Sequence, residues 1–235
     1  MEARPVRMVN LALYLDNILI ISDIHMGYEE ALNMQGILLP RMQFREIIKN
    51  LDSVFKSLKG RKIKKVIING DLKHEFGKIS NTEWRYTLRL LDYLSERCDE
   101  IVLIRGNHDT ILGPVARKRN VMVKGHELLG DTLVIHGDKL PSENILKNIK
   151  TIIIGHEHPA VSLKDGPRIE KYKCFLIGKW KKYSLIVMPS FTPVAEGTDI
   201  LKEQLLSPFL RNIKNFDVFV VGDKVYDFGK VRDLS

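Results

Sequence analysis

Short apolar runs rich in β-branched residues recur along the first two thirds of the chain. Each run is too short for a helix, and its continuous hydrophobicity predicts a strand that is buried on both faces. Two longer segments between the first three runs place apolar residues at three- and four-residue steps, which predicts amphipathic helices. This order predicts a parallel sheet flanked by helices. The predicted strands are residues 18–21, 66–68, 101–104, 133–135 and 152–154, and the predicted helices are residues 41–59 and 82–98.

The pattern changes after Gly155, where strand candidates follow one another with few helical patterns between them. Antiparallel meanders fit such a succession better than crossover connections do. We therefore expect an α/β fold in which two mixed β-sheets pack as a sandwich with flanking helices. Residues 196–215 combine Gly197 and Pro208 with a short apolar stretch, so this part of the surface stays unassigned. The later predicted strands are residues 160–163, 172–177, 183–188, 216–221 and 224–227.

No composition change divides the chain into parts. Its 235 residues are 44% hydrophobic and 28% charged, as in ordinary soluble globular proteins, and no linker rich in Pro, Gly or Ser interrupts them. We therefore expect a single domain over residues 1–235. Cys98 and Cys174 lie far apart in the sequence, which argues against a disulfide framework and a thiolate zinc site. No apolar run approaches the ~18 residues that span a bilayer, which favours a cytoplasmic protein without membrane contact.

A polar segment rich in Asp, Asn or His follows each of the five early strand candidates. The carboxyl ends of strands line one edge of an open α/β sheet, and the loops there build the ligand crevice, so these segments can converge. Any one of their histidines alone is as readily explained as a structural residue. Six of the seven histidines lie in these segments, however, which a scatter of structural histidines would not produce. The segments are residues 22–25, 69–74, 105–109, 136–137 and 155–158.

The side chains of these segments form a set of nitrogen and oxygen donors without a thiolate. Such a set is typical of Mn²⁺, Fe²⁺, Zn²⁺ or Ni²⁺, whereas Mg²⁺ and Ca²⁺ prefer oxygen throughout. Seven protein ligands exceed the needs of one ion, but two ions that share a carboxylate would use them all. Two ions ~3.5–4 Å apart stabilise both the attacking and the leaving oxygen in phosphoryl displacement. The candidate metal ligands are Asp23, His25, Asp71, Asn107, His136, His156 and His158.

The motifs DxH, GDxx(D/H), GNH(D/E), a lone His and GHxH occur in this order between Asp23 and His158. In this respect the sequence resembles the calcineurin-like metallophosphoesterases. The resemblance implies a four-layer αββα architecture and a site for two divalent ions, with Mn²⁺ the first expectation. Residues 23–29 and 155–160 are similar to the branch related to SbcD nucleases and ligase-associated PdeM-type phosphoesterases, a resemblance that covers most of residues 17–199.

The resemblance also assigns roles to residues. The first ion would be held by Asp23, His25, Asp71 and His158, and the second by Asn107, His136 and His156, with Asp71 as the bridge. His108 would stand beside the phosphate, stabilise its charge and protonate the leaving alkoxide. Asp109 would orient backbone or ligands.

His74 occupies a position that separates subgroups of the resembled family. Many of its phosphatases have Asp there, which pairs with the catalytic histidine, whereas nucleases that act on double-strand breaks often have His. We expect His74 as a second catalytic residue that contacts the scissile phosphate or a flanking nucleotide; the alternative is an imidazole that never touches substrate. Tyr28 is close enough to the first motif to line the site, and His126 is expected to be a loop histidine without a motif.

The net charge of +8 favours polyanionic partners, although the basic clusters at residues 61–65, 117–119 and 179–182 could equally be solvated faces. The leading hypothesis is a phosphodiesterase or endonuclease that acts on nucleic acid, with a role in DNA repair. A first alternative is a phosphodiesterase or phosphomonoesterase for small nucleotides. A second alternative is a non-catalytic module that keeps the fold to bind a partner. Oligomeric state and protein partners stay open.

Overall fold

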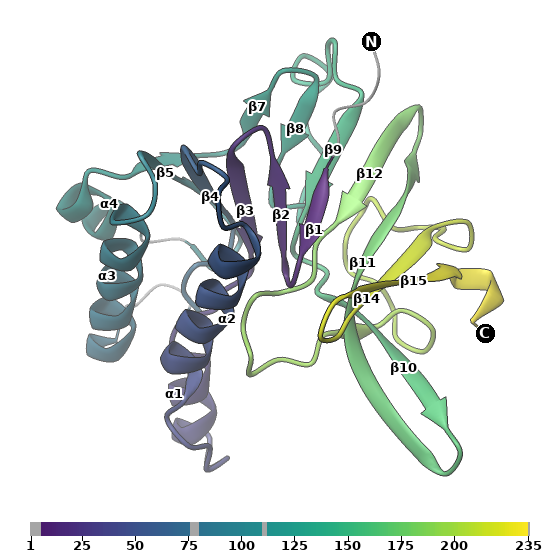
Figure 1. Cartoon of the computed structure of the whole chain (residues 1–235), viewed down its shortest axis with the longest axis horizontal. Helices are drawn as coiled ribbons and strands as arrows, with labels where there is room; N and C mark the ends of the chain where they lie inside the picture. The colour runs from purple at the N-terminus through teal and green to yellow at the C-terminus, as the bar shows by residue number, and fades with distance from the viewer. Residues whose placement is uncertain (1–5, 76–79, 110–111, 235) are drawn as a thin grey trace.

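The computed structural model describes residues 6–75, 80–109 and 112–234. Two β-sheets pack face to face, and helices lie on one side of the pair (Figure 1). The first sheet has the strand order β1-β2-β3-β4-β5-β6; β1, β2 and β3 are antiparallel neighbours, and β3 to β6 are parallel. Its strands are β1 (Arg7–Val9), β2 (Ala12–Leu15), β3 (Ile18–Ser22), β4 (Lys65–Asn69), β5 (Glu100–Ile104) and β6 (Met122–Lys124).

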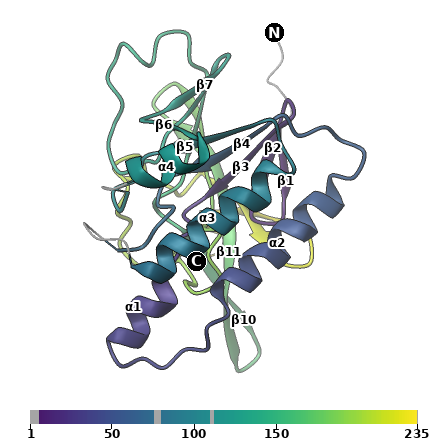
Figure 2. The ribbon, with the colours of Figure 1, turned by 90° about the vertical axis from the view of Figure 1, so that its left-hand side faces the viewer.

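Helices α2 (Gln43–Ser57), α3 (Asn81–Ser95) and α4 (Gly113–Arg119) cover the outer face of the first sheet, as Figure 2 shows. Helix α2 buries Ile47, Leu51 and Val54, which share one face because they recur every three or four residues. Helix α3 begins with a capping box in which the side chains of Ser80 and Glu83 each accept a hydrogen bond from the other residue's backbone N–H. The helices are α1 (Tyr28–Met34), α2 (Gln43–Ser57), α3 (Asn81–Ser95) and α4 (Gly113–Arg119), and a short 3-10 helix covers Val231–Asp233.

The second sheet follows the order β13-β10-β11-β12-β9-β8-β7, with β14 paired to β11 and β15 paired to β14. Antiparallel pairs join β10, β11 and β12, as expected for meanders, while β9 is parallel to both β8 and β12. Its strands are β7 (Glu127–Leu129), β8 (Thr132–Val134), β9 (Thr151–Ile154), β10 (Pro159–Asp165), β11 (Arg168–Trp180), β12 (Tyr183–Val187), β13 (Thr198–Asp199), β14 (Asp217–Val221) and β15 (Val225–Lys230).

The inner faces of the two sheets form one apolar core between them. Ile20, Ile67 and Val102 of the first sheet share this core with Ile153 and Phe175 of the second. The expected α/β fold of two packed mixed sheets is therefore confirmed. The strands that end at polar motifs are buried on both faces, so the motifs extend from the packed core.

The outer face of the second sheet is covered differently from the outer face of the first. Among the described residues, apolar side chains from turns and loops, such as Ile149, Phe209 and Leu210, pack on it in place of a helical layer. Residues 196–215 supply much of this cover and contain only β13 as regular structure. Gly197 and Pro208 interrupt the segment, which explains why no helix forms there. No helix in the described ranges has the length and apolar character needed to cross a membrane.

Candidate metal centre

The polar segments after β3, β4, β5, β8 and β9 meet at one edge of the sandwich. The backbone N–H of Asp23 donates to the carbonyl of Gly70 over 3.2 Å, and that of His25 donates to the carbonyl of Asp71 over 2.8 Å. In the second sheet, the N–H of Gly155 donates to the carbonyl of His136 over 2.8 Å. These backbone hydrogen bonds join loops that are distant in sequence. The structure therefore brings the polar segments together, as the sequence predicts.

Several candidate ligands sit in a backbone conformation that ordinary residues avoid. The φ angles are 53° at Asp23, 47° at His25, 46° at Asp71, 66° at His156 and 51° at His158. This left-handed region costs a side chain about 1 kcal/mol or more and is used where the fold must aim a residue. Here the sharp turns after β3, β4 and β9 direct the next side chains toward the shared edge.

The loops approach each other so closely that glycine is required between them. A Cβ at Gly106 would collide with the carboxylate and backbone of Asp71, and a Cβ at Gly70 would collide with the ring of His136. Glycine permits this contact because it has no side chain. The glycines of the two motifs therefore bring Asp71 within reach of the other ligands.

The first group of candidate ligands is Asp23, His25 and His158, whose ligand atoms lie within 4.8 Å of one another. Nε2 of His25 is 3.2 Å from Nε2 of His158, and the latter is 3.3 Å from Oδ1 of Asp23. Oδ2 of Asp71 lies 3.8 Å from Nε2 of His25. The four residues assigned to the first ion by resemblance are thus in one place.

The second group contains Asp71, His136 and His156, again within 4.8 Å of one another. Nε2 of His136 is 3.3 Å from Oδ2 of Asp71 and 2.9 Å from Oδ1 of Asn107. Oδ2 of Asp71 therefore faces both groups, while its Oδ1 accepts the backbone N–H of His108 over 2.9 Å. This arrangement leaves one oxygen of Asp71 free to bridge two ions.

Electrostatics at the centre favour a positive occupant. Burial alone would raise the pKa of Asp23, but the surrounding His158, His136 and His25 hold it well below its usual range. Burial and the neighbouring His158 lower the pKa of His25 to about 3, so this imidazole is neutral at pH 7. The two buried carboxylates, the neutral ring of His25 and the other ring nitrogens around them fit divalent cations, because carboxylate oxygens and imidazole nitrogens are donors that such ions bind.

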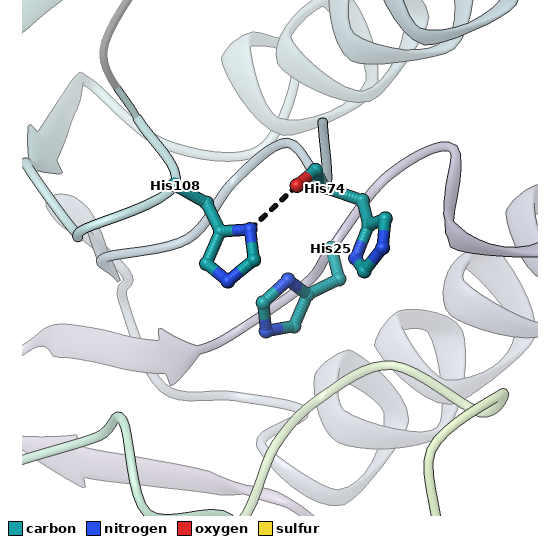
Figure 3. A group of neighbouring side chains, drawn as sticks. All are labelled: His25, His74 and His108. Atoms are coloured by element: carbon teal, nitrogen blue, oxygen red, sulfur yellow. Dashed lines mark hydrogen bonds between the residues drawn. The ribbon is translucent and has the colours of Figure 1, made fainter. Parts of the chain in front are cut away.

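Three histidine rings form a further group beside the first one. His25, His74 and His108 lie together, with 4.9 Å between the ring centroids of His25 and His108 (Figure 3). Nδ1 of His108 is 2.5 Å from the main-chain carbonyl oxygen of His74. Tyr28 stacks on the ring of His74 with 4.1 Å between centroids, and burial lowers the pKa of His74 to about 4. His74 is therefore a neutral ring held between an aromatic face and the centre.

Asp109 holds two motif loops together. Its carboxylate accepts the backbone N–H groups of Leu72 at 3.3 Å, Lys73 at 3.4 Å and Gly106 at 3.1 Å. Burial, together with the charge of Asp71, raises the pKa of Asp109 to about 6. The residue does not belong to either ligand group, and its contacts match the orienting role expected for it.

A hollow of about 280 Å³ opens over the centre. His74, His108 and Asn107 line it together with His156 and His158, and Tyr28 and Leu206 form part of its rim. The two candidate catalytic histidines therefore face the same space as the candidate metal ligands. Tyr28 lines the site as expected.

Sequence reasoning missed the residues that support the centre from behind. The side-chain amide of Gln43 donates to the carbonyl of His25 over 2.7 Å and to Oγ1 of Thr192 over 3.1 Å. Lys173 donates to the carbonyl of Ser190 over 2.9 Å and also to the carbonyl of Thr192. Gln43 lies in an amphipathic helix and Lys173 in a strand. Neither residue belongs to a sequence motif that would have indicated a role at the centre.

Glu157 also supports the candidate centre. Its position between His156 and His158 is a sequence feature that could have indicated this role. Its Oε2 accepts the backbone N–H groups of Leu206 and Ser207, each at 2.8 Å. Burial raises the pKa of Glu157 above its ordinary value. The residue thus ties the loop at the rim of the hollow to the motif that carries His156 and His158.

Comparisons with known proteins agree with this geometry. A family model described as calcineurin-like phosphoesterase matches residues 17–222. The crystal structure of Pseudomonas putida nuclease MPE aligns over 96% of this chain and 96% of that chain, with a TM-score of 0.66 and 18% identity. At this identity the likeness shows a shared fold.

Two other solved structures are more distant. Vps29 from Chaetomium thermophilum covers 93% of this chain and 90% of its own, with a TM-score of 0.37 and 16% identity. A protein of unknown function from Aquifex aeolicus covers 60% of this chain and 78% of its own, with a TM-score of 0.38 and 20% identity. None of the curated proteins compared matches this sequence.

Proposed function

Because this chain belongs to the calcineurin-like phosphoesterase family, we propose that it is a phosphodiesterase that hydrolyses nucleic acid with two divalent metal ions. The position of Asp71 carries the two-ion part of this proposal. One carboxylate oxygen lies 3.3 Å from Nε2 of His136 and 3.8 Å from Nε2 of His25, so it faces both ligand groups at once. Mn²⁺ is the proposed ion, and Fe²⁺, Zn²⁺ and Ni²⁺ suit the same mixed donors.

The proposed ligands divide between the two positions. Asp23, His25 and His158 would hold one ion, and Asn107, His136 and His156 would hold the other, with Asp71 shared. Two such ions, when bound, supply Lewis-acid charge that makes water nucleophilic near neutral pH and neutralises the phosphate.

His108 is the proposed general acid. Its Nδ1 donates to the carbonyl of His74, and its other nitrogen, Nε2, points away from this carbonyl (Figure 3). A proton on Nε2 can therefore be given to the leaving alkoxide while the ring orientation stays fixed. His74 is the proposed second catalytic residue, with its ring beside His108 at the substrate-facing side of the hollow.

The substrate class rests on charge, on His74 and on fold. The chain carries a net charge of +8, which favours a polyanion. His stands at position 74, as in the nuclease branch that the sequence resembles. The Pseudomonas putida protein that shares the fold is a nuclease. We therefore propose a DNA endonuclease related to the SbcD and PdeM branch, with a role in DNA repair.

One observation favours a second candidate function. The hollow over the centre measures about 280 Å³, just under the ~300 Å³ at which small-molecule pockets begin. A phosphodiesterase or phosphomonoesterase for small nucleotides would need no more space than this.

A substrate panel tests both candidates. The protein, loaded in turn with each divalent ion, is assayed on circular single-stranded DNA, on bis-p-nitrophenyl phosphate and on p-nitrophenyl phosphate. The proposal expects Mn²⁺-dependent cleavage of the circle and the diester. Activity on the monoester alone would defeat it. The His74→Asp variant is assayed in parallel and is expected to shift the ratio of rates toward the monoester.

A further inference from the structure

The candidate metal centre borders a second hollow, of about 430 Å³, whose lining includes neither His74 nor His108. Asn107 lines both hollows, and Asn107 and His136 form the part of the second one that adjoins the centre. Two proposed ligands of one ion therefore also form a wall of this second space. Neither the family match nor the proposed catalytic residues assign it a role.

Two cationic side chains, Arg105 and Lys139, line the second hollow. Arg105 is exposed, and within the described ranges its side chain has no hydrogen bond or ion pair. Lys139 extends into solvent with 88% of its side chain exposed and lies 3.6 Å from Asp138, the carboxylate among the lining residues. Such exposed pairs contribute little, so Lys139 can exchange this partner for a phosphate.

His126 also lines this space, at the crossing of the chain from the first sheet to the second. The residue expected to be an ordinary loop histidine thus stands beside Arg105 and Lys139. Its ring adds a hydrogen-bond donor to the lining of the hollow.

Apolar side chains also line the second hollow. Leu140 is 47% exposed, and Pro141 and Ile145 lie beside it in the lining. An exposed apolar surface next to cationic side chains suits a ligand that is itself part anion and part apolar ring. A nucleotide within a polynucleotide strand has this character, with a phosphate at one end and a base at the other.

The geometry of a phosphodiester gives this hollow a place in the proposed reaction. The leaving arm must lie beside His108, in the first hollow, where its oxygen can be protonated. The other arm has to leave the centre in a different direction. The second hollow continues from Asn107 and His136 and offers that direction.

We propose that the second hollow binds the neighbouring nucleotide of a single-stranded polynucleotide, with Arg105 and Lys139 holding its phosphate and Leu140 facing its base. This inference rests on the proposed function and names the substrate surface of the same site. It explains how a centre with a small first hollow can act within a long strand.

The test compares Arg105→Gln, Lys139→Gln and the double variant with a matched control, Lys150→Gln. Lys150 is also an exposed lysine paired with an aspartate, Asp131 at 3.4 Å, but it lies before the amino end of β9, at the opposite edge from His156. The substrates are a labelled single-stranded DNA oligonucleotide and bis-p-nitrophenyl phosphate, both with Mn²⁺. The latter has no second phosphate for Arg105 or Lys139 to hold.

The double variant is expected to lose about tenfold or more in kcat/KM for the oligonucleotide relative to bis-p-nitrophenyl phosphate, chiefly through KM. The slope of log kcat/KM against log salt concentration should fall by about 0.7 for each lost phosphate contact. Lys139→Gln alone should show part of both effects. Because Lys139 is farther along the chain from the proposed ligand Asn107 than Arg105 is, an effect of this variant does not come from a disturbed Asn107. An equal loss on both substrates, or an equal effect in Lys150→Gln, overturns the inference.

Binding separates this inference from the proposed function. Affinity for the same oligonucleotide is measured by fluorescence anisotropy in a His108→Ala background, where turnover is suppressed. Adding Arg105→Gln and Lys139→Gln to this background should weaken binding about tenfold. Unchanged affinity overturns the second hollow as the strand site, whereas cleavage of the monoester alone by the wild-type protein overturns the proposed function.

Discussion

The main-chain carbonyl oxygen of His74 lies 2.5 Å from Nδ1 of His108 and accepts its hydrogen bond. A carbonyl can only accept, so Nδ1 carries a proton and Nε2 is the nitrogen left for the proton transfer to substrate that we propose. Because the anchor belongs to the backbone, it survives any substitution of the His74 side chain. The two histidines can therefore be separated by mutation, although they lie side by side.

His108→Ala should retain both metal ions and lose turnover. Removing a general acid typically costs 10²–10⁴-fold, and a loss of at least about tenfold is the minimum expected here. Steady-state hydrolysis of bis-p-nitrophenyl phosphate gives the rate, and elemental analysis of the dialysed protein gives the metal content. His74→Ala keeps the carbonyl anchor and is expected to lose less. Hydrolysis untouched by His108→Ala would show that leaving-group protonation lies elsewhere.

Asp71→Asn should weaken both ions at once. The carboxylate oxygen that faces His25 and His136 is replaced by a neutral amide, so each ion loses one charged ligand. Asp131→Asn is the control, because Asp131 pairs with Lys150 before the amino end of β9, at the opposite edge from His156. Metal content after dialysis should fall below one ion per chain in the first variant and stay unchanged in the second. Loss of a single ion only would argue against the bridge.

Metal affinity should rise with pH. Burial alone would lower the pKa of His136, but its hydrogen bond to Asp71 and the charge of Asp23 raise the pKa to about 9 in the metal-free protein. The ring is therefore protonated at pH 7 and must release a proton when it binds an ion. Affinity for Mn²⁺ should increase by about tenfold per pH unit up to about pH 9.

Calorimetry in buffers of different ionisation enthalpy counts this proton directly, and equal heats in all buffers would contradict the prediction.

The proton on His136 also affects the stability of the metal-free fold. Since the pKa of His136 in the folded protein exceeds the ordinary value of 6.5, the pairing of its protonated ring with Asp71 and Asp23 stabilises the fold fully below pH 6.5. This stabilisation is lost as the pH rises through about 9.

Asp109→Ala should destabilise the protein by about 2–4 kcal/mol, because three backbone N–H groups lose their acceptor. Asp109→Asn keeps one carbonyl oxygen and should cost less. Asp131→Ala, which removes the partner of the exposed Lys150, serves as control and should cost less than about 1 kcal/mol. Urea denaturation measures all three. A cost for Asp109→Ala no larger than for the control would show that its loop contacts are dispensable.

The strands that carry the site were predictable because they are buried on both faces. Residues 18–21 and 152–154 were expected as strands, and β3 and β9 are Ile18–Ser22 and Thr151–Ile154. The hairpin of β1 and β2 was missed, since its strands have only three and four residues, too few for a clear pattern. Helices α1 and α4 have seven residues each, too few for a periodic pattern to stand out.

The residues that meet at the centre were predictable from motif order, but their mutual contacts were not. Nothing local in the sequence indicates that the carbonyl of His74 anchors His108, or that Gln43 reaches back to His25. The second hollow joins Arg105, His126 and Lys139 from separate loops, and only the folded chain brings them together. Such features depend on packing between residues that are distant in sequence, and local sequence patterns do not predict it.

The left-handed turns at Asp23, His25, Asp71, His156 and His158 imply that this cage exists before any cation arrives. The ligands are aimed by the folded backbone, so loading needs little rearrangement and can be fast. The energy for holding five disfavoured turns comes from the apolar sandwich beneath them. A substitution in the core between the sheets, far from any donor atom, should therefore weaken metal retention before it unfolds the protein.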